Sequence, residues 1–310
     1  MHLLVAGSSG LIGSALVDAA LERGDTVTRL VRRTAPQAAA PPAGVTDVSW
    51  DVDAGFVDLD RLAGAGPIDG VVHLAGAGVG DRRWSSTRKR VILDSRTRGT
   101  DLVARTVAAL DPRPAALVSA SAVGWYGDRG HDVLLESEPA GTGFLAGVCV
   151  AWEAATQPAE AAGIRTVHLR TGIVLSPTGG ALARQLPLFR LGVGGRIGSG
   201  QQYRSWITLD DEVRAILHCL DDAGLSGAVN ATAPSPATDA QLAAALGAAL
   251  HRPAVVPVPA FALKLALGPE MAEDMVLASQ RALPSRLTGS GFEFRHAELD
   301  EAVRSVLSGT

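Results

Sequence analysis

The first residues with a chemical use are three glycines at a fixed spacing, in Gly7-Ser8-Ser9-Gly10-Leu11-Ile12-Gly13. They stand between an apolar run, Leu3 to Ala6, and a segment with apolar residues at helical spacing. In a phosphate-binding turn the first glycine makes the bend, the second lets a pyrophosphate approach and the third lets the helix pack closely. The helix N-terminus adds N–H groups and the positive end of its dipole. The pattern predicts a dinucleotide site, with an ordinary glycine-rich turn as the alternative. Its members would be Gly7, Ser9, Gly10, Leu11, Ile12 and Gly13.

The next apolar run, from Thr26, ends in Arg32 and Arg33 and is followed by no acidic residue before Asp47. Sites for NAD place an acid here against the ribose hydroxyl, whereas arginine accommodates the 2′-phosphate of NADP. We therefore expect NADP(H) as the cofactor, held at its phosphate by Arg32 and Arg33. The alternative is two solvated arginines on a loop.

Further apolar runs alternate with helical patterns through the first half of the chain. The expected strands are 26–31, 45–52, 70–74, 115–121 and 166–174, and the expected helices between them include 86–110 and 144–162. Such βαβ units indicate an α/β fold with a Rossmann-type, doubly wound parallel sheet. We expect an NADP(H)-binding domain over 1–175, to which 206–232 returns, and a smaller substrate lobe over 176–310.

The composition excludes several classes of function. The 310 residues carry a net charge of −4, so nothing favours nucleic-acid binding. The two cysteines, Cys149 and Cys219, form neither a disulfide framework nor a metal-ligand spacing. No apolar run is long enough to span a membrane, and the first residues suggest a strand rather than a signal peptide. We expect a cytoplasmic, soluble protein without a metal. Its expected partners are a small-molecule substrate and, as an open option, a second copy of the chain.

Several short motifs resemble the extended short-chain dehydrogenase/reductase superfamily. They are the glycine turn, Trp50-Asp51, His73-Leu74-Ala75-Gly76 and Ser119-Ala120-Ser121. The resemblance implies that Asp51 meets the adenine amine and that Leu74, Ala75 and Gly76 lie along the cofactor. Ser119 and Arg170 are assigned to the same site.

A closer resemblance, to an "epimerase-family" subgroup with a C-terminal domain of unknown function, runs nearly end to end. Its members resemble nucleotide-sugar epimerases and are usually labelled oxidoreductases. The matching stretches include Tyr126-Gly127-Asp128, Trp152-Glu153, 169–175, 198–200, Trp206-Ile207 and 284–294.

The superfamily's Tyr-x-x-x-Lys pair is missing. Its lysine lowers the pKa of the tyrosine, so that the phenol can pass a proton while hydride moves. The only tyrosines are Tyr126 and Tyr203, and the fourth residue after each is a glycine or an isoleucine. Cys149 stands where the lysine is expected, and Arg96 where the superfamily usually has an asparagine.

Other residues are therefore candidates for the chemistry. Ser121 matches the superfamily's catalytic serine, with Ser119 as a register-shifted alternative and a serine that only satisfies backbone at the strand end as the other reading. Tyr126 is a second candidate, as proton donor, with aromatic packing as the alternative. For the substrate, arginine and an aromatic ring beside a glycine-rich segment favour a planar, phosphorylated or otherwise anionic molecule, including a nucleotide-linked one. The candidate substrate-binding residues are Arg96, Arg204 and Trp206.

Two functions remain open from the sequence. One is an NADPH-dependent oxidoreductase or epimerase-like enzyme with non-standard catalytic residues. The other is a sensor or regulatory protein that binds NADP(H) and turns nothing over. The intact glycine turn agrees with both, the serine-bearing strand favours the first and the missing pair favours the second.

Overall fold

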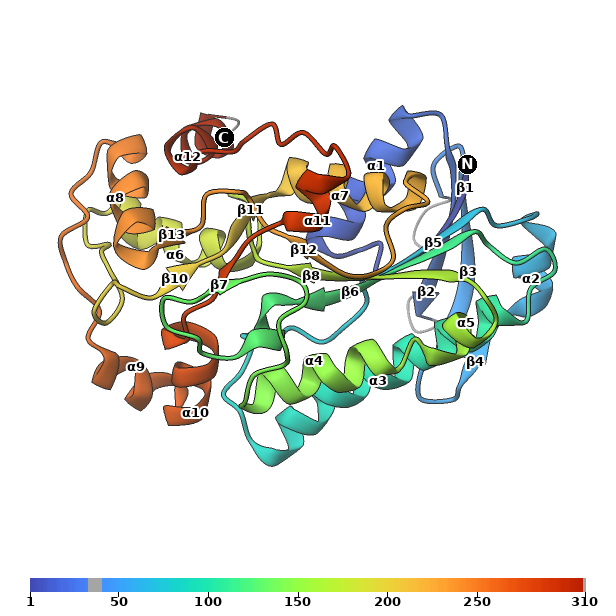
Figure 1. The fold of residues 1–310 in the computed structure, drawn as a ribbon, viewed down its shortest axis with the longest axis horizontal. Coiled ribbons are helices and arrows are strands. Elements are labelled where there is room, and N and C mark those ends of the chain that lie inside the picture. Colours follow the sequence, from blue (N-terminus) through green and yellow to red (C-terminus); the bar gives the residue numbers. More distant parts are fainter. Residues whose placement is uncertain (33–40, 309–310) are drawn as a thin grey trace.

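The fold is built on one eight-stranded sheet that crosses the middle of Figure 1. The computed structural model describes residues 1–32 and 41–308. In chain order the strands of this sheet are β1 (His2–Ala6), β2 (Thr26–Arg32), β3 (Val45–Asp51), β4 (Phe56–Val57), β5 (Gly70–His73), β6 (Ala116–Ala122), β8 (Arg165–Thr171) and β12 (Gly227–Ala231). Their spatial order is β12-β8-β6-β5-β1-β2-β3-β4, and only the β3–β4 pair is antiparallel. The predicted Rossmann-type parallel sheet is confirmed.

The chain changes direction across the sheet between β1 and β5, which lie side by side at its centre. From β1 it proceeds outward to β2 and β3, and from β5 it proceeds the other way to β6 and β8. Open α/β sheets bind ligands at the carboxyl ends of the strands where the order reverses. Gly7 follows β1 and Leu74 follows β5, so the two expected cofactor segments border this crevice.

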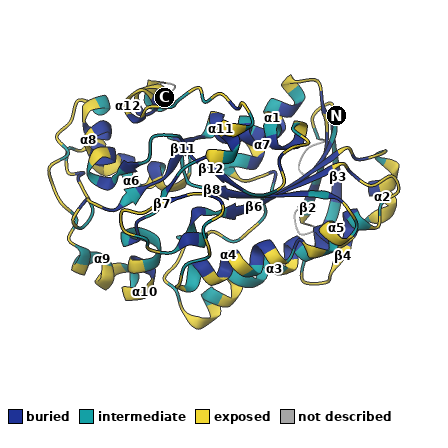
Figure 2. Cartoon of the chain, viewed as in Figure 1, coloured by how far each residue is buried: buried dark blue, intermediate teal, exposed yellow. Residues whose placement is uncertain are grey.

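Helices cover both faces of the sheet. One face carries α1 (Leu11–Glu22) and α7 (Leu209–Asp221), and the other carries α3 (Ser86–Ala108), α4 (Phe144–Ala154) and α5 (Gln157–Ala161) (Figure 1). A strand covered on both sides is apolar on both sides. Leu3, Leu4 and Val5 of β1 are accordingly buried, and Figure 2 shows the central strands in the colour of buried residues.

The smaller lobe has an apolar core of its own. Leu186 of α6 (Gly180–Arg190), Leu246 of α8 (Asp239–Leu250) and Val303 of α12 (Leu299–Ser308) meet in it. The remaining short elements are α2 (Leu59–Gly64), the 3-10 turn η1 (Val123–Tyr126), β7 (Val133–Leu134), β9 (Ile173–Leu175), β10 (Tyr203–Arg204), β11 (Trp206–Thr208), β13 (Ala237–Thr238), α9 (Ala260–Leu267), α10 (Pro269–Met271), the π-helical turn η2 (Ala272–Leu277), β14 (Arg281–Ala282) and α11 (Ser285–Gly289).

Two expected elements are divided in the structure. The strand expected over 166–174 breaks at Gly172, because β9 leaves the large sheet to pair with β11. A Cβ at Gly172 would lie 2.5 Å from the Ser205 carbonyl oxygen, so only glycine fits the crossing. The helix expected over 144–162 divides into α4 and α5, and Thr156 between them bonds His168 of β8 at 2.9 Å.

Glu212 of α7 is a carboxyl group fully buried against the sheet. Its Oε1 accepts a hydrogen bond from Thr171 Oγ1 at 2.8 Å, and its Oε2 has no partner among the described residues. Burial raises the pKa of Glu212 from 4.5 to about 8, because the charged form would lose its hydration.

This raised pKa predicts that the protein loses stability as the pH rises. Between pH 4.5 and about 8 the unfolded chain releases the Glu212 proton while the folded protein retains it. The free energy of unfolding should therefore fall by up to about 1.4 kcal/mol per pH unit across this window. In the variant Glu212→Gln the side chain cannot ionise, so the free energy of unfolding, measured with denaturant, should no longer fall with pH. The slope should be measured above pH 6.5. Buried His73, whose pKa is lowered from 6.5 to about 4, makes stability rise with pH, but only below pH 6.5. Equal slopes in both proteins would contradict the assignment.

Candidate functional site

The glycine turn after β1 has space for backbone only. Gly7 has a φ of +87°, and a Cβ there would lie 2.7 Å from the backbone nitrogen of Ala75. A Cβ at Gly13 would lie 2.2 Å from the Gly7 carbonyl oxygen, so this glycine lets α1 pack on the turn. At Gly10 the nearest atom would be 3.4 Å away, and Gly10 is exposed. The turn is closed on the inside and open where a ligand would approach.

The N-terminus of α1 has the character of an anion site. Its N-cap is Gly10, no side chain caps it, and its first turn has no acidic residue. Ser9 is exposed beside it, and Leu11 and Ile12 open the helix. Free N–H groups and the helix dipole favour a phosphate here. These residues fit the diphosphate of a dinucleotide.

The turn after β5 forms the opposite wall of the crevice. The Leu74 N–H donates to the Ala6 carbonyl at 2.8 Å, which joins this turn to β1. Beyond Ala75, Arg96 Nη1 donates to the Ala77 carbonyl at 2.9 Å, and a Cβ at Gly76 would lie 3.3 Å from the Arg96 guanidinium carbon. The guanidinium lies 4.8 Å from the centre of the Trp152 ring. Arg96 therefore supports the turn from α3, under the expected path of the cofactor.

The expected adenosine end lies at the tips of β2 and β3. Arg32 ends β2, is exposed and pairs in register with Trp50. Arg33 lies outside the described residues. Asp51 ends β3 and uses Oδ1 to accept the N–H groups of Asp53 and Ala54, at 2.9 and 3.0 Å.

The serines of β6 are both buried but differ in their bonding. Ser121 Oγ donates to Glu153 Oε1 of α4 at 2.6 Å. Ser119 Oγ has no partner among the described residues and lies in register with His73, whose two ring nitrogens likewise lack one there.

A closed hydrogen-bond network surrounds Arg170 of β8. Its Nε and Nη2 donate to the two oxygens of Glu153, at 2.9 and 3.0 Å, and its guanidinium stacks 3.9 Å from the Trp125 ring centre. Its Nη1 donates to the Tyr126 hydroxyl at 3.1 Å, and that hydroxyl donates to Asn230 Oδ1 at 2.8 Å. Arg170 is 3% exposed, so it anchors this network rather than meeting a cofactor directly.

Tyr126 does not reach the substrate side of the crevice. The residue is 0% exposed, and its hydroxyl has a partner on each side. Burial raises the pKa of Tyr126 above its ordinary value, although the neighbouring Arg170 acts in the opposite direction. Tyr126 lies in η1 just past the end of β6, but its hydroxyl is enclosed, which favours the packing alternative over a role as proton donor.

Leu145 and Cys149 occupy the face of α4 toward the end of β6. A Cβ at Gly124, just past β6, would lie 3.6 Å from Leu145 Cβ and 3.8 Å from Cys149 Sγ. Burial raises the pKa of Cys149 to about 12, so the thiol stays neutral. Cys149, at the position where a lysine is expected, therefore carries no charge.

A cavity of about 260 Å³ opens at the N-terminus of α4, between the sheet and the smaller lobe. Leu145 lines it from the α4 side, and three carboxylates line it elsewhere: Asp128, Glu273 and Asp274. Asp274 Oδ2 accepts the Phe144 N–H at 2.7 Å and so caps α4 from another segment. None of the lining residues is basic, which opposes the expected anionic substrate.

Arg204 and Trp206, the predicted substrate-binding residues, do not line this cavity, and both are buried. Arg204 is 6% exposed, pairs with Asp239 at 3.1 Å and donates to the Val276 carbonyl. Trp206 is 0% exposed within the core of the smaller lobe, and its Nε1 donates to the Ser235 carbonyl at 2.9 Å. Both hold segments of the lobe together.

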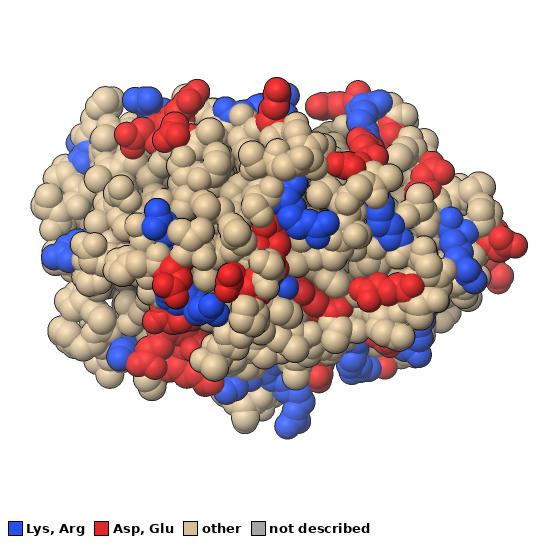
Figure 3. Space-filling view, viewed as in Figure 1, with Lys and Arg blue, Asp and Glu red and all other residues tan. Residues whose placement is uncertain are grey.

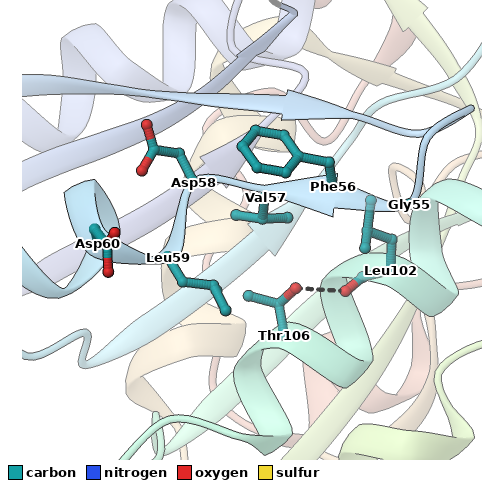
Figure 4. A pocket seen from close by; sticks show the side chains of 8 residues that line it. All are labelled: Gly55, Phe56, Val57, Asp58, Leu59, Asp60, Leu102 and Thr106. Carbon is teal, nitrogen blue, oxygen red and sulfur yellow. Dashed lines mark hydrogen bonds between the residues drawn. The ribbon is translucent and has the colours of Figure 1, made fainter.

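A second hollow, of about 580 Å³, lies away from the crevice at the sheet edge near β4. Figure 4 shows Leu59 of α2 and Thr106 of α3 on its two sides, with the Thr106 hydroxyl bonded to the Leu102 carbonyl at 2.7 Å. It includes none of the predicted site residues.

Within residues 1–32 and 41–308, no helix has the length and apolar character needed to cross a membrane. The same residues contain no grouping of three His, Cys, Asp or Glu side chains suited to a metal ion.

Comparison with known proteins identifies the family of the chain. The model of the NAD dependent epimerase/dehydratase family matches residues 3–231, and a domain of unknown function, DUF1731, matches residues 258–306. The chain belongs to the NAD dependent epimerase/dehydratase family. The resemblance to extended short-chain dehydrogenases of an epimerase-family subgroup is thereby confirmed.

Relatives of this epimerase-family protein match it over almost all of their length. It is 45% identical over 96% of its chain to Epimerase family protein Mb2239 of Mycobacterium bovis, of which 95% is covered. Identity to human Epimerase family protein SDR39U1 is 33%, over 99% of this chain and 100% of the relative. The crystal structure of human SDR39U1 (isoform2) with NADPH superposes with a TM-score of 0.87 at 31% identity, covering 100% of both chains.

The acidic side of the cavity was missed by sequence reasoning. Glu273 and Asp274 belong to the DUF1731 match, far along the chain from α4. Their surroundings show no motif that could have indicated a contact with Phe144, which depends on the folding back of η2.

The network predicts that Tyr126→Phe acts on stability and not on turnover. Loss of the hydroxyl leaves Asn230 and Arg170 each without one buried partner, which costs about 1–3 kcal/mol. Denaturant unfolding should show this loss, while NADPH affinity remains that of the wild type. Loss of turnover at unchanged stability would restore Tyr126 as a proton donor.

Proposed function

We propose that this epimerase-family protein is an NADP(H)-dependent oxidoreductase for a small substrate, working without the Tyr-x-x-x-Lys pair. The observation that supports it most is the glycine turn, which is closed to side chains and leads into an uncapped α1 beside the β5 turn. The human relative of known structure carries NADPH. Gly7, Gly10 and Gly13 would hold the diphosphate, and Arg32 with Arg33 the 2′-phosphate. The nicotinamide supplies or accepts hydride when bound.

The Ser121–Glu153 pair is the proposed route for the proton. Ser121 already directs its own proton to the Glu153 carboxylate, so its lone pairs are left to accept a hydrogen bond from a substrate hydroxyl. Arg170 holds both oxygens of that carboxylate and fixes its orientation. In alcohol oxidation the substrate proton would pass to Ser121 while the serine proton passes to Glu153. In carbonyl reduction the same two protons would move back, so Glu153 would first take up a proton from solvent.

The cavity at α4 favours a substrate that donates hydrogen bonds. Carboxylate oxygens of Asp128, Glu273 and Asp274 accept hydrogen bonds and repel anions. Its volume of about 260 Å³ suits a small hydroxylated or cationic molecule. The substrate carbonyl or alcohol would then extend toward the end of β6.

A second candidate function is a cofactor-binding protein without turnover. Ser121 is 4% exposed, Tyr126 is fully buried, and both hydroxyls donate to internal acceptors. Hydroxyls that already have internal acceptors need no substrate to complete their hydrogen bonds. The two candidates share the cofactor and differ in turnover.

The cofactor assignment predicts a preference for NADPH over NADH. Arg32→Ala/Arg33→Ala should weaken NADPH binding about 10- to 100-fold, because charge-assisted bonds to the 2′-phosphate are lost. Binding of NADH should change little. Fluorescence titration measures both, with Arg98→Ala as a control, since Arg98 lies nearby and pairs with Asp53. Equal affinities of the wild type for the two cofactors would contradict the assignment.

The turnover assignment predicts substrate-dependent oxidation of NADPH. We expect absorbance at the nicotinamide band to fall with at least one neutral hydroxylated carbonyl compound from a panel. Ser121→Ala should abolish this change and keep the affinity for NADPH, whereas Ser199→Ala in the smaller lobe should leave both unchanged. Tight NADPH binding without oxidation across the panel would favour the second candidate.

A further inference from the structure

The buried carboxylate of Glu153 is occupied by hydrogen bonds at both oxygens. Each oxygen accepts one from Arg170, and Oε1 accepts a further one from Ser121. A proton on this carboxyl group would leave Arg170 as a buried cation without its counter-charge, which is costly. Glu153 can therefore hold a proton only briefly. If it serves Ser121 in turnover, another group has to exchange protons between Glu153 and solvent.

His168 of β8 lies where such a group is needed. It stands two residues before Arg170, so the two side chains share one face of the strand. His168 Nδ1 is 3.8 Å from Glu153 Oε2, the oxygen that Ser121 does not bond. One bridging water or a shift of about 1 Å would close this separation to a hydrogen bond. Contacts between catalytic groups are often long before substrate binds and tighten in the complex.

The other ring nitrogen of His168 faces the junction of α4 and α5. Nε2 lies 2.9 Å from Thr156 Oγ1 and 3.2 Å from Glu160 Oε1. Thr156 Oγ1 lies 2.8 Å from the same Glu160 oxygen, and a hydroxyl can accept one hydrogen bond while it donates another. Thr156 is the N-cap of α5, yet its hydroxyl does not cap that helix. It contacts the Glu153 carbonyl, His168 and Glu160 instead.

His168, Thr156 and Glu160, called the outer series below, connect the buried carboxylate to the surface. The side chain of Glu153 is 9% exposed, that of His168 14% and that of Glu160 46%. Figure 1 shows α4 and α5 following one another along the same face of the sheet, and Figure 3 shows acidic side chains at the surface over this stretch. The outer series therefore ends in water.

The imidazole of His168 is neutral at pH 7. Burial lowers the pKa of His168 below its ordinary value of 6.5, while Glu153 and Glu160 act in the opposite direction and Arg170 in the same one. A neutral imidazole carries a proton on one ring nitrogen and accepts one at the other. His168 can therefore take up a proton on one side of the ring and release one on the other.

We propose that the outer series is a proton relay between Glu153 and solvent. The relay rests on the proposed function, because it is needed only if Ser121 and Glu153 carry the proton of the reaction. It extends that function by a path along which the buried pair is recharged. The tyrosine and lysine that the superfamily uses have no part in it.

The proton transfers balance over one reaction. In carbonyl reduction the substrate carbon gains a hydride from the nicotinamide, and the substrate oxygen gains the Ser121 proton. Ser121 regains a proton from Glu153, and Glu153 regains one from His168 Nδ1. His168 Nε2 then receives a proton from water through Thr156 or Glu160. One proton is consumed for each carbonyl reduced, and alcohol oxidation reverses every transfer and releases one.

The first test is chemical rescue of turnover. With the panel compound that the wild type reduces, His168→Ala should lower kcat about 100-fold and leave KM and the affinity for NADPH unchanged. Imidazole in solution should restore the rate in proportion to its concentration, because it replaces the missing proton carrier. Glu160→Gln, at the exposed end, should cause a smaller loss. The matched control is His218→Ala, which should keep the wild-type rate. His218 also lies 3.8 Å from a carboxylate, that of Asp222, but belongs to α7 on the other face of the sheet.

The second test needs no substrate. NMR of isotope-labelled histidine measures how fast the His168 ring N–H exchanges its proton with water. Thr156→Val/Glu160→Gln should slow this exchange about 10-fold, because neither new side chain passes a proton outward. His218 in the same sample is the internal reference, and its exchange rate should not change.

Two kinds of result would overturn the relay. A His168→Ala rate equal to that of the wild type, or a lowered rate that imidazole does not restore, would leave His168 only the structural role of joining α5 to β8. Equal exchange rates at His168 in the wild type and the Thr156/Glu160 variant would contradict the path to water. If no panel compound oxidises NADPH, the proposed function fails, and the exchange measurement decides separately whether the outer series conducts protons.

Discussion

The ion pair between Arg170 and Glu153 determines the arrangement around the end of the sheet. Two charges this deeply buried are tolerated only when nearly every polar atom has a partner. The pair meets that condition by drawing in Ser121 from β6, Tyr126 from η1 and the Glu136 carbonyl at 3.2 Å. Segments from β6, η1, the Glu136 loop, α4 and β8 are thereby fixed together. The same demand explains why the two candidate catalytic hydroxyls point inward.

Sequence reasoning succeeded where local patterns control the structure. The glycine turn could be located because each glycine meets a steric limit set by neighbouring backbone, and the strands could be located because burial on both faces makes them continuously apolar. It failed where residues distant in sequence determine the surroundings of a side chain. Arg204 beside glycine-rich chain resembles a substrate residue until Asp239 and Val276 fold onto it. Trp206 likewise resembles an aromatic platform, but the smaller lobe closes around it.

The cavity shows the same dependence on distant segments. Gly124, Leu145 and Asp128 belong to the NAD dependent epimerase/dehydratase match, whereas Glu273 and Asp274 of η2 belong to the DUF1731 match. The expectation of an anionic substrate was drawn from arginines that prove to be structural. With those arginines engaged elsewhere, the electrostatic character of the cavity is set by carboxylates, of which Glu273 and Asp274 lie in no motif that the sequence singles out.

Two departures from the superfamily pattern, Arg96 and Cys149, are electrostatically coupled. The two side chains are close enough to interact electrostatically, and burial lowers the pKa of Arg96 while raising that of Cys149. A lysine at position 149 would place a second cation against a guanidinium that is already poorly solvated. A neutral thiol avoids that repulsion and leaves Arg96 free to bond the Ala77 carbonyl below the β5 turn. An arginine in place of the usual asparagine therefore disfavours a lysine at position 149, and a tyrosine without its lysine would lose the cation that lowers its pKa.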